Sequence, residues 1–82
     1  MEYEIILTKE VLQEIGADVF AKYCRYAIQH QIEDSAHPIK IMARLVWEAK
    51  QSIFQAITMA DLEQIQGRFD MAEAFLDAFK EE

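Results

Sequence analysis

Apolar side chains in residues 62–79 recur at alternating steps of three and four positions, which is the spacing of one face of an α-helix. Acidic side chains fall on the opposite side of the same projected helix. Such a helix buries one face and holds negative charge in water. The apolar positions are Leu62, Ile65, Phe69, Ala72, Leu76 and Phe79, and the acidic ones are Asp70, Glu73, Asp77 and Glu81. The pattern predicts an acidic, all-α protein.

Two more helices are expected upstream of this segment. Thr8 is a good N-cap residue and precedes an apolar stripe with helical spacing, which predicts a helix over residues 9–33. Pro38 disfavours helical geometry at the residue before it and is tolerated in a first helical turn, so a second helix is expected over residues 38–57.

The third helix has its own start signal. Thr58 and Asp61 resemble a capping box with Asp in the usual Glu position, which predicts a helix over residues 59–80 after a very short connection. Gly16 lies inside the first helical segment, where Gly costs about 1 kcal/mol relative to Ala. The apolar pattern continues through it, which favours one helix, whereas a break there would give a four-helix bundle.

A small three-helix bundle formed by residues 1–82 as a single helical domain is therefore the expected fold, because a chain of 82 residues has material for one core. Residues 1–7 alternate weakly and are expected to form an extended N-terminal arm, either packed on the bundle or paired as a strand with another chain. The apolar stripes are wide for three helices, which suggests a homodimer or a grooved surface that a partner covers.

The net charge of −7 is unevenly distributed. Residues 1–20 and 58–82 carry −4 and −5, whereas residues 21–57 carry +2. Direct nucleic-acid binding and anionic membrane binding both need concentrated cations, so neither is expected. The chain also lacks an apolar run of the ~20 residues needed to span a bilayer. The single cysteine, Cys24, cannot form an internal disulfide, and a cytoplasmic protein is expected.

No motif in the chain indicates catalysis, a cofactor or a metal ion. The possible metal ligands Cys24, His30, Glu33 and His37 are six, three and four residues apart, unlike the paired spacing of structural zinc sites. Cys24 falls on the apolar face of its helix, where a reactive thiolate is disfavoured. The acidic row of residues 70–81 comes from one helix and points outward, whereas carboxylate metal sites draw on facing helices.

The function predicted from these features is that of a non-enzymatic acidic regulator or inhibitor that binds another protein. Small helical proteins of this class are often carried by phages and mobile elements, which suggests a basic nucleic-acid-binding surface of the host machinery as the target. The expected contact residues combine acidic steering with apolar anchors. They are Asp70, Glu73, Asp77, Glu81, Trp47, Met71 and Phe75.

Two alternatives remain open from the sequence. One is a homo-oligomeric structural bundle or assembly adaptor, whose surplus apolar surface would be covered by copies of itself. The other is a metal-dependent enzyme built on the acidic row of the third helix, which is disfavoured by its outward direction.

Overall fold

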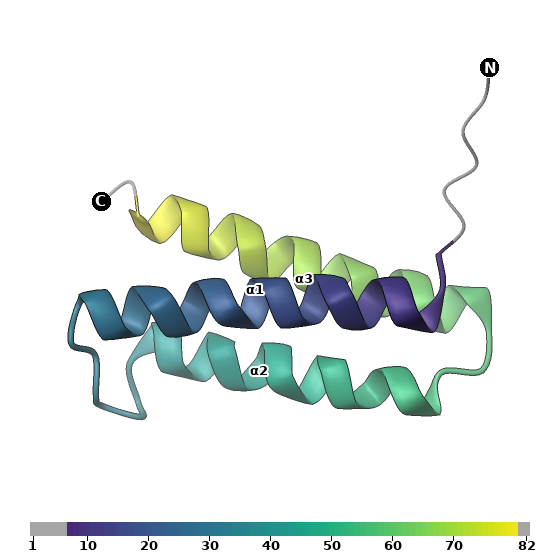
Figure 1. The fold of residues 1–82 in the computed structure, drawn as a ribbon, viewed down its shortest axis with the longest axis horizontal. Coiled ribbons are helices and arrows are strands. Elements are labelled where there is room, and N and C mark those ends of the chain that lie inside the picture. Colours follow the sequence, from purple (N-terminus) through teal and green to yellow (C-terminus); the bar gives the residue numbers. More distant parts are fainter. Residues whose placement is uncertain (1–6, 81–82) are drawn as a thin grey trace, which may run out of the picture.

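Three α-helices and one short 3-10 helix make up the computed structural model, which describes residues 7–80. The elements are α1 (Lys9–Gln29), α2 (Pro38–Ser52), η1 (Ile53–Gln55) and α3 (Met59–Lys80). Each long helix contacts the other two, so they close into a bundle (Figure 1). The predicted all-α three-helix fold is confirmed. Residues 1–6 of the predicted arm and Glu81 lie outside the described residues.

The core lies between the three helices and is apolar throughout the described residues. Its largest fully buried side chains are Tyr23, Phe69, Leu12, Ile39, Ile53, Leu76 and Val19. The one hydroxyl among these, on Tyr23 of α1, donates a hydrogen bond to the carbonyl oxygen of Ala72 in α3. Burial, with a contribution from Asp77, raises the pKa of Tyr23 to about 12. Tyr23 therefore stays neutral and joins α1 to α3 through a polar contact inside an apolar core.

Gly16 does not interrupt α1, so the four-helix alternative is wrong. A Cβ atom at this position would lie 2.7 Å from Cζ of Phe69, closer than van der Waals contact allows. The ring of Phe69 fills the space that a side chain on residue 16 would need. The glycine is therefore explained by close packing of α1 on α3 instead of by a turn.

The first helix ends at Gln29, and the predicted end at residue 33 is wrong. Gln31 adopts a left-handed conformation with φ of 54°. Its N–H donates to the carbonyl of Ile28, and the N–H of Ile32 donates to the carbonyl of Ala27, at 3.2 and 2.9 Å. These two bonds form a Schellman motif, which satisfies the last carbonyls of the helix and turns the chain away.

The second helix also ends before the predicted residue 57. Regular α2 ends at Ser52, η1 continues to Gln55, and Ala56 is extended with φ of −67° and ψ of 133°. The hydroxyl of Ser52 donates to the carbonyl of Glu48 at 3.0 Å, a bond that competes with regular helical pairing. The chain can then turn into α3 within three residues.

The predicted capping box at the start of α3 is confirmed. The hydroxyl of Thr58 accepts a hydrogen bond from the backbone N–H of Asp61 at 3.2 Å. In return, the Asp61 carboxylate accepts from the N–H groups of Ile57 and Thr58, both at 3.1 Å. This reciprocal arrangement satisfies amides that the helix itself leaves unpaired. The helix runs from Met59 to Lys80, as predicted.

Acid sensitivity is expected from this cap. The hydrogen bonds from Ile57 and Thr58 hold the pKa of Asp61 below its usual value of about 3.9. The resulting stabilisation is complete above that value and is lost as the pH falls through the folded-state pKa. Asp61→Asn should therefore reduce stability at pH 7 and flatten its dependence on pH below about 4. Thr58→Ala should lower the free energy of unfolding by about 1 kcal/mol at both neutral and acidic pH.

Urea unfolding at neutral and acidic pH, followed by circular dichroism, measures this effect. Asp70→Asn is the matched control, because Asp70 is an exposed carboxylate of the same helix that takes no part in the cap. If the Asp61 and Asp70 variants showed the same pH dependence, the assigned role of the cap would be wrong.

Candidate protein-binding site

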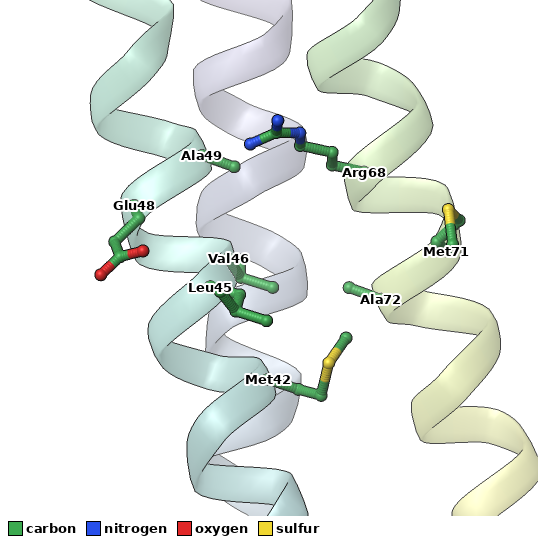
Figure 2. A pocket seen from close by; sticks show the side chains of 8 residues that line it. All are labelled: Met42, Leu45, Val46, Glu48, Ala49, Arg68, Met71 and Ala72. Carbon is green, nitrogen blue, oxygen red and sulfur yellow. The ribbon is translucent and has the colours of Figure 1, made fainter.

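A groove runs between α2 and α3 and is lined mainly by apolar side chains. We call it the α2–α3 groove; its volume is about 260 Å³. Val46 and Ala49 of α2 and Ala72 of α3 are buried at its base. The other side chains that line it are Met42, Leu45, Glu48, Arg68 and Met71. Figure 2 shows these eight residues on the two facing helices.

Two large apolar side chains of this groove are open to solvent. Met71 is 73% exposed and Leu45 is 49% exposed. Both belong to the edges of apolar helical stripes that are wider than the bundle can cover. Exposed apolar residues gathered at one groove are a feature of protein-binding surfaces, and the flexible thioether of methionine adapts to partners of different shape.

The charged groups of the groove have different surroundings. Arg68 extends from α3 across the groove toward Ala49, whereas Glu48 points away from it (Figure 2). Glu48 lies 3.5 Å from Arg44, one turn earlier in α2. Within residues 7–80, Arg68 takes part in none of the ion pairs. The groove therefore offers an apolar base with one available cation at its rim.

The residues predicted to bind a partner fall on different parts of the bundle. Met71 lines the α2–α3 groove. Phe75, 38% exposed, lies one turn further along α3, with its ring 6.1 Å from that of Phe79. Trp47 lies between α1 and α2 instead, where its ring is 5.4 Å from that of Phe20.

The residues of the predicted acidic row also differ in their surroundings. Glu73 lies 3.4 Å from Lys22 of α1, which also lies 3.5 Å from Asp18. Glu73 and Asp18 raise the pKa of Lys22. Asp70 and Asp77 are exposed. Of these acidic side chains, Glu73 already pairs with a lysine of another helix, whereas Asp70 and Asp77 face solvent.

The two histidines considered as possible metal ligands make contacts within the protein. Nδ1 of His37 accepts a hydrogen bond from the N–H of Ile39 at 3.1 Å and so caps α2. The ring of His30 lies 4.1 Å from that of Tyr26. Among the described residues, no group of three or more His, Cys, Asp or Glu side chains is placed to hold a metal ion. Nor is any helix in this part of the chain long and apolar enough to cross a membrane.

Sequence reasoning did not single out Leu45, Met42 or Arg68 as contact residues. The signal available was the width of the stripe on the second helix, which Leu45 extends beyond the core positions. Periodicity gives the direction of such a side chain, but only the position of the neighbouring helix decides whether it is covered.

Comparison with known proteins gives one match. Residues 1–79 match the model of the family described as bacterial epsilon antitoxin. No curated protein and no solved structure matches the chain. An antitoxin is a regulatory protein that inhibits a toxin, so this family agrees with the predicted inhibitor that binds another protein. Since the match covers 79 of the 82 residues, the chain belongs to the bacterial epsilon antitoxin family.

Proposed function

We propose that this protein inhibits a protein toxin by binding it directly, with the α2–α3 groove as the contact surface. The observation that carries the proposal is the pair of large exposed apolar side chains, Met71 and Leu45, above a buried apolar base. The antitoxin family supports a toxin as the occupant.

The affinity would come mainly from apolar contact. Full burial of one side chain of this size contributes about 1.5–3 kcal/mol, and Met71 is still largely open to water in the free protein. Arg68 at the rim can donate hydrogen bonds to a carboxylate of the toxin. The expected toxin segment is therefore apolar, with an acidic group at one edge.

The acidic surface of α3 would act on the rate of association. A net charge of −7 attracts a basic toxin over long distances at low salt. Asp70 and Asp77 are the exposed carboxylates expected to contribute most, because Glu73 is already paired with Lys22. Glu81, also predicted as a contact residue, lies outside the described residues.

The decisive variant is Met71→Ser, which removes apolar contact without adding charge. It should weaken binding to the toxin about tenfold, corresponding to ~1.4 kcal/mol. Ile28→Ser is the matched control, because Ile28 is 76% exposed but lies on α1, away from the groove. Isothermal titration calorimetry measures both affinities, with toxin recovered from the native host in complex with the tagged full chain.

The toxin is identified in this experiment by growth arrest when it is produced alone. Growth should recover with the original chain and with Ile28→Ser, and recover less with Met71→Ser at matched expression. Unchanged affinity for Met71→Ser, with weaker binding by Ile28→Ser, would move the contact away from the α2–α3 groove.

Some finer sequence predictions stay predictions. They concern carriage by phages or mobile elements, action on the host's nucleic-acid machinery, the homodimer and the cytoplasmic location.

A further inference from the structure

A second groove, which we call the α1–α2 groove, lies between the first two helices and has a volume of about 510 Å³. Phe20 of α1 and Trp47 of α2 line its walls, and the buried side chains of Tyr23 and Ile39 lie at its base. It is formed by a different side of α2 from the one that faces α3. It is therefore a separate surface from the α2–α3 groove.

Aromatic rings form one part of this surface. The rings of Phe20 and Trp47 lie 5.4 Å apart and are tilted by 48°. The Lys50 ammonium lies 5.4 Å from the centre of the Trp47 ring, within range of a cation–π interaction. Trp47 nevertheless remains 46% exposed. A large, rigid and partly open aromatic side chain of this kind is a frequent anchor of protein interfaces.

The charge of the α1–α2 groove is opposite to that of the protein. In α2, three cations accompany one acid, which makes it +2, whereas α1 is neutral and α3 carries −3. Lys40 and Arg44 line the groove, and none of the residues that line it in the described structure is acidic. An acidic protein thus presents a local positive wall beside an apolar base.

These cations are available to a partner. Within residues 7–80, Lys40 takes part in no ion pair, and Arg44 pairs only with Glu48 on its own helix, at 3.5 Å. Both members of that pair are well exposed, and exposed pairs of this type contribute about 0.3–0.5 kcal/mol. A carboxylate from another molecule can replace Glu48 at little cost.

We propose that the α1–α2 groove binds an acidic amphipathic helix of a partner protein. Its apolar face would pack on Phe20 and Trp47, and its carboxylates would pair with Lys40 and Arg44. The two cations are four residues apart, or ~6 Å along the helix axis, which matches carboxylates one turn apart on a partner helix. This inference does not depend on the toxin-binding role of the α2–α3 groove.

The surroundings favour a peptide over a nucleic acid. A polyanion requires a concentrated set of cations, whereas here only Lys40 and Arg44 line a largely apolar groove. An apolar base between aromatic walls requires apolar side chains, which an amphipathic helix supplies together with its acidic residues.

Trp47 is the only tryptophan of the chain, so its fluorescence reports on this groove. The probe is a synthetic peptide of about 20 residues, long enough for helix formation, with leucines on one face, glutamates beside them and no tryptophan. Titration into the full chain should give a saturable change in Trp47 emission. The same peptide with Gln in place of Glu should bind at least about tenfold more weakly.

The charge variants separate a specific contact from general attraction. Lys40→Gln/Arg44→Gln should weaken binding of the acidic peptide at least about tenfold. Lys9→Gln/Arg25→Gln removes two exposed positive charges of α1 that line neither groove, and it should leave the affinity within about twofold of the original. Circular dichroism and urea unfolding of both double variants serve as the control for correct folding.

Three results would overturn the proposal: an unchanged Trp47 emission, equal weakening by the two double variants, or binding of a single-stranded oligonucleotide or anionic phospholipid vesicles in place of the peptide. The last would assign the groove to phosphate groups. Met71→Ser should leave peptide binding unchanged, so failure here is distinguishable from failure of the toxin-binding proposal.

Discussion

Replacing Phe69 with Ala is expected to lower the free energy of unfolding by about 3–5 kcal/mol. Phe69 is fully buried in α3, and its ring lies against Gly16 of α1. Removing the ring leaves a cavity that two rigid helices cannot close. Small domains have total stabilities of about 5–15 kcal/mol, so this single change should remove a large part of the stability.

Urea denaturation followed by far-UV circular dichroism measures this loss. Phe75→Ala is the matched control, because Phe75 belongs to the same helix but is partly exposed. It should cost less, because Phe75 is 38% exposed and its removal opens to solvent instead of leaving an enclosed cavity. Equal losses for the two variants would show that Phe69 does not have the central packing role described here.

The second large effect concerns the two glycines, which should respond to alanine in opposite directions. At Gly16 a new Cβ would lie 2.7 Å from the Phe69 ring, and overpacking of this kind costs about 1–3 kcal/mol or more. Alanine's better helix propensity returns only about 1 kcal/mol. Gly67 has no atom within 4 Å of the corresponding position, so Gly67→Ala should raise stability by about 0.5–1 kcal/mol.

A double variant tests the cause of the Gly16 effect. Leucine at position 69 is shorter than phenylalanine, so Gly16→Ala should be less harmful in the Phe69→Leu background than in the original protein. The double-mutant cycle should therefore show a coupling of about 0.5–3 kcal/mol between the two positions. Strictly additive changes, or stabilisation by Gly16→Ala alone, would contradict a steric contact.

Features encoded locally were predictable from the sequence. The apolar periodicity predicted three helices, and Thr58 with Asp61 predicted the start of α3 through a cap that spans four residues. The ends of α1 and α2 were not predictable in the same way. Gln31 adopts a left-handed conformation that usually favours glycine, and Ser52 bonds back to Glu48, so neither end carries a strong composition signal.

The candidate site was less predictable because it depends on which helix lies beside which. Met71 was expected to be a contact residue and does line the α2–α3 groove. Glu73 was expected to be free, yet it meets Lys22, a residue 51 positions away in the sequence. Trp47 was grouped with Met71 as an apolar anchor, whereas packing places it beside Phe20. Helical periodicity gives no information about contacts between residues that are far apart in the sequence.

The contact of Gly16 with Phe69 also fixes the axial register of α1 against α3. Sliding α1 by one helical turn would bring Leu12 or Phe20 against the ring, and both carry the Cβ atom for which there is no room. The two helices can therefore dock at one height only. Consequently, α1 and α3, which form the outer walls of the two grooves beside α2, keep the same height relative to each other when a partner binds.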